Sequence, residues 1–402
     1  MNILIITPSF NQLDYIKRAI ASVRDQVGYG IRDYDLGVKE SFKLKPQHLT
    51  HGSQPITIHH HVQDGGSTDG TVDWLRKFDE DRHEVRLKQC AGSEAVNQKS
   101  EDRPPKTAAS NATYNFHSKI ETKEIGSSLK PSAAVSDYSF SYESTPDNGM
   151  YDALNKGIDF IMGTHEVRSM RNSSEAETQE ALGNSPPSNQ QAPAPNHHDS
   201  IVAWLNCDEQ YLPRTLKKVA DYFEKHPDVD FVYGNTLLVD AQGTLVSCRK
   251  NPPLRKLYVE SDHLYTQSAS MFFRSKIFEQ GFRFDTDWKA VSDCDFVLQL
   301  LARGFKTGRI DGYLSSFTMT GDNLSANDIG WSELEKWRSK TPRILRLMSL
   351  PFRGARCLEK VVLGGFNQRF PLDYAIYAGD DLEDRASFRA NSGTTRFVSW
   401  SR

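Results

Sequence analysis

The chain has 402 residues, a length that allows two or three domains or one large domain with insertions. Its formal net charge of −3 gives no reason to expect a nucleic acid as partner, and its 10% of aromatic residues excludes a wholly disordered chain. The five cysteines stand far apart without a Cys-x-x-Cys pair, which argues against a disulfide scaffold or zinc module and for a reducing compartment.

The chain contains no run of about 18 apolar residues, the length that a helix needs to cross a bilayer. The first ten residues lack the basic region and the cleavage site of a secretory signal. We therefore expect a cytoplasmic protein.

The N-terminal part alternates predicted strands with predicted helices. Residues 2–7 form a short apolar run, typical of a strand that is covered on both faces. Residues 13–27 then repeat apolar side chains every three or four positions, which predicts a helix. A second strand is predicted at 56–63, followed by a Gly-rich loop and another helix, and a third strand at 84–89.

The same alternation continues after residue 149. The apolar spacing predicts a helix at 150–161, a strand at 201–206 and a helix opened by Pro213. Residues 230–239 and 244–248 are interpreted as a hairpin. Alternating strands and helices predict an α/β fold whose sheet is mostly parallel and flanked by helices.

Three segments, at about 28–54, 91–142 and 163–200, are longer than ordinary connections and are interpreted as low-complexity insertions. The third has no Phe, Trp or Tyr, so we expect it to be disordered. The second is rich in Ser, Lys and Ala, although three aromatic residues at its end could dock on the domain.

Residues 331–402 are predicted to form a basic, amphipathic, helical extension. Between Lys336 and Arg369 the chain has nine Lys or Arg and one acidic residue, interleaved with apolar side chains. Two interpretations remain open. The basic flank of these helices could rest on anionic headgroups at the inner face of a membrane. Alternatively, a helix could pack on the domain and leave its arginines in solvent.

Four segments occur in the order ITPSFN, VQDGGSTDGT, PDNGMYDALNKG and VAWLNCDEQYLP. Together they resemble family 2 of the glycosyltransferases. The resemblance covers residues 1–26, 55–90, 144–162 and 200–325. It implies a GT-A fold, a Rossmann-like α/β domain, over residues 1–330. It also implies an inverting glycosyltransferase of hexosyltransferase type, which moves a sugar from a nucleotide-diphosphate sugar to a hydroxyl of a glycan or lipid-linked acceptor in cell-surface polysaccharide or glycan synthesis.

The resemblance places the nucleotide sugar at the carboxyl ends of the strands. The residues that it implies there are Thr7, Pro8, Ser9, Asn11, Asp64, Gly65, Asp147, Asn155, Lys156, Asn206 and Asp208. Some have simpler interpretations, because Asn11 could only cap the following helix and Lys156 could be a solvated residue. Asp69 is expected to be a structural cap.

Asn206-Cys-Asp-Glu209 stands where the family has its Asp-x-Asp motif or a variant of it. The resemblance therefore implies Asp208 and Glu209 as ligands of Mg²⁺ or Mn²⁺, hard ions that prefer oxygen. The loop 318–325 resembles a segment near the donor diphosphate, with phosphate contacts expected from Thr320, Ser325 or backbone amides.

Ser292-Asp-Cys-Asp-Phe296 resembles the family's Glu-Asp-x-Asp stretch, in which Asp293 matches the catalytic base. Asp295 is the second candidate catalytic carboxylate, or else the first-turn acid of a helix. The departures at Asn206, Glu209 and Ser292 motivate an alternative, a non-catalytic nucleotide-sugar-binding or scaffold protein. A nucleotidyltransferase would show a Gly-rich basic loop after the first strand, which TPSFNQ is not.

Three adjacent histidines, at 59–61, are the last candidate cluster. Successive side chains of a strand point to opposite faces, so three neighbours cannot converge on one metal ion. We expect them to be structural.

Overall fold

The computed structural model describes residues 1–27, 56–81, 137–163, 200–321, 323, 328–380 and 382–395. The chain divides into two units, Met1–Val72 with Ala133–Arg402 and Asp73–Ser132, and the fold below is that of the first unit. The predicted strand at 84–89, most of the predicted insertions and the predicted phosphate contact Ser325 lie outside the described residues.

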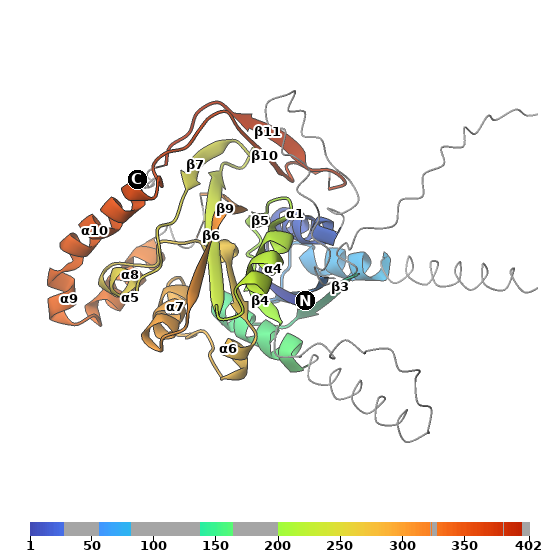
Figure 1. Ribbon diagram of the computed structural model, residues 1–402. Coiled ribbons are helices and arrows are strands. Elements are labelled where there is room, and N and C mark those ends of the chain that lie inside the picture. The colour runs from blue at the N-terminus through green and yellow to red at the C-terminus, as the bar shows by residue number, and fades with distance from the viewer. Residues whose placement is uncertain are drawn as a thin grey trace, which may run out of the picture. The chain divides into compact units, whose positions relative to one another are not determined.

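Within the described residues, nine strands form one sheet in the order β3-β2-β1-β4-β8-β6-β9-β5, with β7 paired to β6 (Figure 1). They are β1 (Asn2–Ser9), β2 (Thr57–Asp64), β3 (Asp137–Ser144), β4 (Ile201–Trp204), β5 (Glu209–Tyr211), β6 (Phe231–Val239), β7 (Leu245–Arg249), β8 (Met271–Arg274) and β9 (Thr307–Thr318). Strands β1–β4 are parallel, β6 is parallel to β9, and β5, β7 and β8 run antiparallel to their neighbours. The predicted α/β fold with a mostly parallel sheet is confirmed.

The helices and helical turns cover this sheet and continue beyond it. They are α1 (Leu13–Arg24), η1 (Asp25–Val27), α4 (Thr215–Lys225), α5 (Lys256–Ser261), η3 (Ser268–Ser270), α6 (Lys276–Glu279), α7 (Ser292–Ala302), α8 (Asp328–Ser339), α9 (Arg343–Leu347) and α10 (Ser349–Val362). Two further helices occupy residues 71–81 and 150–163.

The third parallel strand corrects the sequence analysis. β3 lies in the segment assigned to the insertion 91–142, and it pairs with β2 so that Tyr138 lies beside Ile58. Its sequence, DYSFSYES, places an aromatic residue at every second position, as in a half-buried strand. Because the preceding residues are polar, the sequence analysis assigns the start of β3 to the insertion. The predicted end of that insertion, at residue 142, therefore lies too far along the chain.

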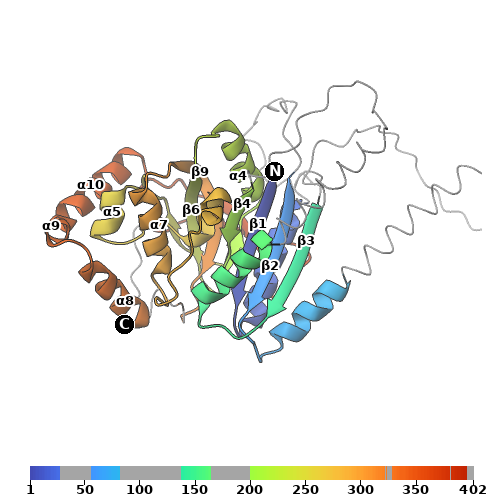
Figure 2. The same cartoon turned by 90° about the horizontal axis from the view of Figure 1, so that it is seen from below.

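The two faces of the sheet carry separate cores, because alternate residues of a strand point to opposite sides. Leu4 and Ile6 of β1 pack with the helix over 150–163 and with α6 and α7. Ile3 and Ile5 pack with α1 and α4 on the other face. The arrangement can be followed from below in Figure 2.

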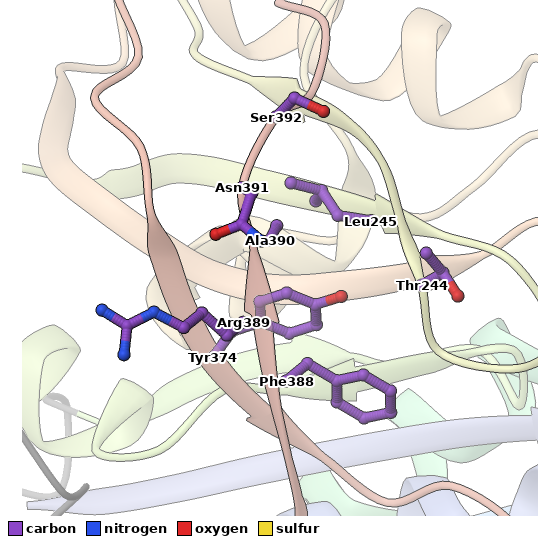
Figure 3. Close-up of a pocket in the computed structure, with 8 residues that line it drawn as sticks. All are labelled: Thr244, Leu245, Tyr374, Phe388, Arg389, Ala390, Asn391 and Ser392. Carbon is purple, nitrogen blue, oxygen red and sulfur yellow. The ribbon is translucent and has the colours of Figure 1, made fainter.

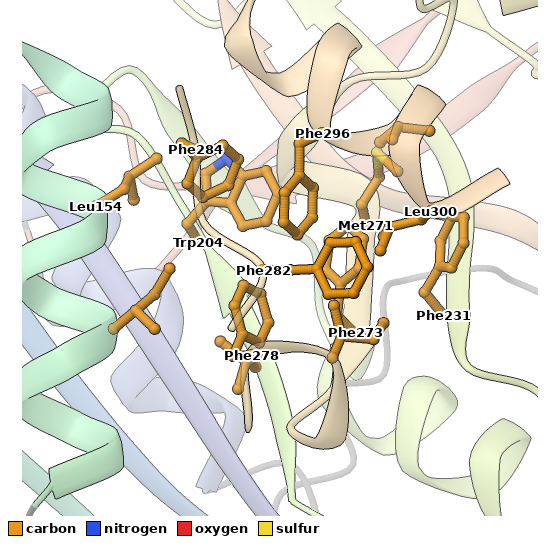
Figure 4. Close-up of a cluster of buried hydrophobic side chains, with 14 of the residues drawn as sticks. Leu154, Trp204, Phe231, Met271, Phe273, Phe278, Phe282, Phe284, Phe296 and Leu300 are labelled. Atoms are coloured by element: carbon orange, nitrogen blue, oxygen red, sulfur yellow. The ribbon is translucent and has the colours of Figure 1, made fainter. Parts of the chain in front are cut away.

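Stacked aromatic rings fill the centre of the first core (Figure 4). Trp204, the last residue of β4, stacks on Phe273 with ring centroids 5.2 Å apart. Phe284 meets Trp204 edge-on at 4.9 Å and packs on Phe296 of α7 at 4.6 Å. These rings fix the carboxyl end of β4 relative to the first turn of α7.

The C-terminal extension is only partly as predicted. It is helical through α8, α9 and α10, but it then forms a two-stranded antiparallel sheet of β10 (Leu372–Ile376) and β11 (Ala386–Ala390). Tyr374 and Ile376 of β10 are buried against Leu237 and Val239 of β6. Every second side chain of β10 is therefore apolar where the strand covers an apolar patch on β6.

Asp262, directly after α5, joins two helices of the extension to the sheet domain. This carboxylate is 2% exposed. Its Oδ1 pairs with Nη2 of Arg338 in α8 and of Arg353 in α10, both at 2.6 Å, and its Oδ2 pairs with Arg356 at 2.7 Å. Burial alone would raise the pKa of Asp262, but the hydrogen bonds and charges of His263 and these arginines hold it well below its usual range.

Replacing Asp262 should therefore destabilise the protein. Asp262→Asn leaves three arginines without their common partner, and we expect the free energy of unfolding to fall by about 2–3 kcal/mol at pH 7 in urea denaturation. Because folding lowers this pKa, the contribution is fully present above the unfolded pKa near 4 and is lost as the pH falls from there through the lower pKa of the folded state. The difference between the two proteins should therefore shrink on acidification.

Asp228→Asn is the matched control, because Asp228 forms an exposed pair with Lys306 at 3.2 Å. Such pairs contribute little. Equal effects of the two substitutions would contradict the role given to Asp262.

Candidate functional site

The carboxyl end of β1 lies beside the turn that follows β4. Thr7 is fully buried, and its hydroxyl hydrogen-bonds to His60 Nε2 of β2 at 2.9 Å, so it joins two strands. The carbonyl oxygen of Pro8 accepts a hydrogen bond from Cys207 Sγ at 3.3 Å. Ser9 is buried, and its Oγ has no hydrogen-bond partner among the described residues. A buried hydroxyl without a partner is costly, which makes Ser9 Oγ a candidate ligand contact.

Asp64, at the end of β2, shapes the loop that follows it. Its Oδ2 accepts hydrogen bonds from the backbone N–H groups of Gly66 and Ser67, each at 2.9 Å, and from Ser144 Oγ at 2.7 Å. Its Oδ1 accepts a bond from Ser67 Oγ at 2.5 Å. A carboxylate has about four acceptor sites, so the chain itself occupies Asp64.

Asp69 caps the helix that follows β1. Its Oδ2 accepts the N–H of Leu13 at 3.0 Å, and its Oδ1 accepts the N–H of Thr71 at 3.1 Å, which opens the next helix. The prediction that Asp69 is a structural cap is confirmed. Asn11 is not the cap of α1, since it has φ of 52° and its Oδ1 accepts the N–H of Thr68 at 2.8 Å. It ties the loop after β1 to the loop after β2.

Asp147 lies opposite the loop after β2. A Cβ added to Gly65 would come within 2.5 Å of Asp147 Oδ2, so a larger residue at position 65 would have to displace the Asp147 carboxylate. Asp147 Oδ1 accepts the N–H of Gly149 at 2.8 Å. Burial raises the pKa of Asp147.

The two polar candidates on the helix over 150–163 both contact protein groups. Asn155 exchanges two hydrogen bonds with the backbone of Phe284, at 2.9 and 3.0 Å, and so braces the aromatic core. Lys156 Nζ donates to the carbonyl oxygen of Pro146 at 2.9 Å and pairs with Asp152 at 3.1 Å. Lys156 is thus not a free solvated residue.

The turn 206–209 carries two carboxylates, those of Asp208 and Glu209, which have different surroundings. The backbone N–H of Asn206 donates to Glu209 Oε2 at 2.8 Å, and the Glu209 carboxylate also receives a hydrogen bond from the side chain of Ser268. Glu209 is 1% exposed and closes the turn. Asp208 is half-buried, and Asn206 Oδ1 is buried without a partner among the described residues.

Asn323 was not identified from the sequence, although it lies in the quoted loop 318–325. Its Nδ2 donates to Asp208 Oδ2 at 2.7 Å, and its Oδ1 accepts the N–H of Thr320 at 3.0 Å. The backbone N–H of Thr318 also bonds to the carbonyl oxygen of Asp208 at 2.8 Å. The loop after β9 is thereby fastened to the turn after β4. The sequence offers only one signal for this contact, which is the presence of an amide side chain, Asn323, in the loop that the resemblance places near the diphosphate.

Asp293 begins the first turn of α7 and is paired with a tyrosine that the sequence analysis missed. Tyr151 is buried, and its hydroxyl donates to Asp293 Oδ1 at 3.2 Å. The N–H of Cys294 donates to the same oxygen at 2.8 Å. Burial raises the pKa of Asp293 to about 6 despite these two bonds. Tyr151 lies within the quoted segment PDNGMYDALNKG, but its apolar spacing indicated only core packing.

Asp295, two residues on, has different surroundings. Its Oδ1 accepts a hydrogen bond from Trp337 Nε1 of α8 at 3.2 Å, and its Oδ2 accepts one from Gln299 Nε2 at 2.8 Å. Oδ1 therefore joins α7 to α8, whereas the hydrogen bond of Oδ2 lies within α7.

Asp208, Glu209 and Asp293 form one electrostatic group. Burial raises the pKa of Asp208 to about 6. The pKa of Glu209 is raised well above its usual range, first by burial, then by the charge of Asp208, and also by that of Asp293. The turn after β4 and the start of α7 thus bring three carboxylates into a region where their charges repel one another. Such a region favours a cation or a proton.

The three histidines are distributed as predicted. His60 bonds to Tyr138 and lies edge-on to Phe140, whereas His61 stacks on Phe160 with ring centroids 4.2 Å apart. His59 bonds to Ser139 Oγ at 2.7 Å. Their structural role is confirmed. Among the described residues, no group of three or more His, Cys, Asp or Glu is placed to hold a metal ion by itself.

A pocket of about 260 Å³ lies elsewhere, beside β10 and β11 (Figure 3). It is lined by Thr244, Leu245, Tyr374, Phe388, Arg389, Ala390, Asn391 and Ser392. None of these residues belongs to the carboxylate group, and we assign it no role in the candidate site.

In the part of the chain that the structure describes, no helix combines the length and the apolar character that crossing a membrane requires.

Comparison with known proteins gives limited similarity. No protein-family model matches the chain. The uncharacterized glycosyltransferase MJ1057 of Methanocaldococcus jannaschii is 27% identical over 120 residues, which are 29% of this chain and 41% of that protein. The match thus spans less than half of that relative.

Two solved structures align with the chain at low similarity. TarS residues 1–349 of S. aureus, in complex with UDP-GlcNAc, aligns over 92% of this chain and 77% of its own, with a TM-score of 0.42 and 10% identity. The mannosyltransferase PcManGT from Pyrobaculum calidifontis, in complex with GDP-Man and Mn²⁺, aligns over 92% and 76%, with a TM-score of 0.37 and 12% identity. These values are too low to identify a function.

The carboxylate group makes a prediction about stability. The pKa of Asp293 is about 6 in the folded protein and near its ordinary value of 3.8 in the unfolded chain. The folded state therefore binds the proton more tightly, and stability falls as the pH rises through the interval between these values. Asp293→Asn removes this penalty, so it should raise the free energy of unfolding by about 1–2 kcal/mol at pH 8 and not at pH 4.

The measurement is urea denaturation at both pH values. Asp311→Asn, on the exposed part of β9, serves as the control and should change little at either pH. A loss of stability at pH 8 for Asp293→Asn would show that Asp293 is not a destabilised buried acid.

Proposed function

We propose that the protein is an inverting glycosyltransferase that moves a sugar from a nucleotide-diphosphate sugar to an acceptor hydroxyl. The observation that carries this proposal is the group of three carboxylates at the carboxyl end of β4 and the start of α7. Ser9 Oγ at the end of β1 and Asn206 Oδ1 in the turn after β4 are buried and have no hydrogen-bond partner among the described residues. Ligands of α/β sheets bind at such strand ends. The ordered motifs of the sequence and the partial similarity to a glycosyltransferase agree with it.

A divalent ion fits the turn after β4. Asp208 would hold Mg²⁺ or Mn²⁺, with the free Asn206 Oδ1 as a second oxygen, because hard ions prefer oxygen ligands. When bound, the ion would offset the charge that develops on the departing nucleoside diphosphate. Glu209 is already engaged by Asn206 N–H and Ser268, so we assign it to holding the turn.

The nucleotide sugar would lie along the ends of β1 and β4. Ser9 Oγ would accept a hydrogen bond from the nucleoside or donate one to it, whereas Asp64 would act by shaping the loop after β2. Lys156 reaches a diphosphate only by leaving Asp152 and Pro146. We therefore assign donor contacts to the strand ends and a supporting role to this helix.

Asp293 would take the proton from the acceptor hydroxyl as its oxygen attacks the anomeric carbon and the sugar–phosphate bond breaks. Hydrogen bonds from Tyr151 and from Cys294 N–H both reach Oδ1, which leaves Oδ2 as the accepting oxygen. A pKa of about 6 keeps the carboxylate ionised at neutral pH yet basic enough to accept the proton. Asp295 is held by Trp337 and Gln299, so we give it a structural role. The expected acceptors are glycans or lipid-linked sugars of cell-surface polysaccharide synthesis.

Asp293→Asn should separate binding from turnover. We expect donor binding to stay nearly unchanged and turnover to fall about 10²–10⁴-fold, the usual contribution of a general base. Turnover is measured as manganese-dependent release of nucleoside diphosphate from a panel of nucleotide sugars, and binding by calorimetry with the donor that is active. Asp311→Asn is the control for a lost surface carboxylate.

Wild-type protein that binds a donor but never releases nucleoside diphosphate would favour the non-catalytic binding protein. Release that Asp293→Asn does not slow would remove Asp293 from the reaction while keeping the enzyme.

Asp208→Asn should abolish the metal dependence. We expect manganese to raise the affinity of the wild-type protein for a nucleoside diphosphate at least about tenfold, and the variant to lose this increase, because the ion loses its carboxylate ligand. Calorimetric titration with and without chelator measures it. An increase that persists in the variant would place the ion elsewhere.

A further inference from the structure

Helix α10 packs on the domain with its charged side inward. Arg353 and Arg356 pair with the buried Asp262, and Glu359 Oε1 pairs with Arg255 Nη2 at 2.5 Å. A helix on the surface of a globular domain ordinarily buries its apolar side and exposes its charges. α10 is therefore inverted relative to the usual orientation.

The outward side of α9 and α10 is apolar. The exposed side chains, with exposed fractions, are Ile344 (70%), Leu347 (80%), Leu350 (72%), Leu358 (65%), Val361 (56%) and Val362 (76%). At 100° per residue, the four on α10 fall within a sector of about 120°, and the charged residues of the helix occupy the rest. We call these six residues the outer apolar face.

Three exposed arginines lie on α9 or follow α10 in the chain. Arg343 and Arg346 lie on α9, and Arg369 follows α10. All three are exposed, and none forms an ion pair with a described residue. The aliphatic side chains of α9 therefore stand next in sequence to two unpaired positive charges.

We propose that the outer apolar face docks on an anionic lipid bilayer, with α10 lying in the plane of the interface. α10 has 14 residues and is about 21 Å long, a continuous aliphatic surface that can enter the boundary between headgroups and acyl chains. Arg343, Arg346 and Arg369 supply the charge complementarity to anionic headgroups. Figure 1 shows α9 and α10 at the edge of this unit farthest from β3, where a planar surface can reach them.

The composition of the face favours lipid over a protein partner. Protein interfaces concentrate their binding energy in buried Trp, Tyr and Arg anchors seated in pockets. The outer apolar face carries Leu, Ile and Val side chains, and the exposed side chains of Met348, Leu363 and Phe366, which adjoin these helices in the sequence, add one aromatic ring and no Trp or Tyr. This arrangement differs from both interpretations drawn from the sequence, because the arginines of α10 hold the helix to the domain and its apolar side faces outward.

The test uses the full chain and vesicles of equimolar phosphatidylglycerol and phosphatidylcholine, with pure phosphatidylcholine vesicles alongside. We expect sedimentation with the anionic vesicles, weakened by high salt. The triple variant Leu350→Ser, Leu358→Ser and Val362→Ser should reduce the partition constant at least about tenfold, because each substitution removes exposed aliphatic surface without touching Asp262. Arg343→Gln with Arg346→Gln should reduce it several-fold.

Lys225→Gln with Arg303→Gln is the matched control, since it removes two exposed positive charges from α4 and from the end of α7. It should leave vesicle binding unchanged. Equal loss in both double variants, or no binding of the wild type to either vesicle, would overturn the proposal. So would concentration-dependent dimers that the triple variant dissociates while vesicles bind neither protein, since the face would then belong to a second copy. Vesicle binding requires no turnover, so its failure is distinct from a failure of the glycosyltransferase proposal.

Discussion

The packing of Trp204 against Phe273, Phe284 and Phe296 is the contact on which the candidate site depends. Trp204 ends β4 four residues before Asp208, and Phe296 lies three residues after Asp293. Phe284 is held by Asn155 on the helix over 150–163, the helix that also supplies Tyr151. One rigid aromatic cluster therefore sets the relative positions of the strand, the helix and the first turn of α7. The carboxylates cannot separate to relieve their repulsion without breaking this cluster.

Desolvated carboxylates have pKa values shifted in opposite directions in two parts of the molecule. Asp262 is nearly inaccessible, but three arginines converge on it, so the ionised form is favoured and its pKa is lowered. Asp208 and Asp293 accept hydrogen bonds but have no cationic partner within the described ranges, so burial dominates and the pKa of each is raised to about 6. Unfavourable burial of acids is typical of sites that work on ligands, whereas full pairing is typical of structural anchors. The difference lies in the partners and not in the residue type.

The same anchor links the outer apolar face to the rest of the unit. Asp262 holds α10 through Arg353 and Arg356, and it holds α8 through Arg338. α8 in turn reaches the first turn of α7, where Trp337 donates to Asp295. The inverted orientation of α10 is thus stabilised by buried ion pairs, which a helix with its apolar side inward would not need. In the proposed docking, a lipid surface would supply the apolar environment that the domain does not offer to this side.

The sequence by itself determined the local elements and the class of fold. Apolar period and turn chemistry predicted β1, α1, β2, the helix over 150–163, β4 and the β6–β7 hairpin, because these signals arise between residues close in the chain. It also indicated that Asp69 would be a cap and that the three histidines would be structural, since both follow from local geometry. The prediction from composition was wrong at β3, because this strand directly follows a long polar segment and was assigned to it.

Only the tertiary structure decided which side chains meet. The pairs Tyr151 with Asp293, Asn323 with Asp208, and Asp262 with its arginines join residues 76 to 142 positions apart, and no local pattern encodes them. The engagement of Asp64 and Glu209 by the backbone around them was equally hidden, because hydrogen bonds of a turn depend on its three-dimensional course. The orientation of α10 was decided in the same way. A sequence shows that a helix is amphipathic, but which side faces the domain depends on buried partners such as Asp262, contributed by a distant segment.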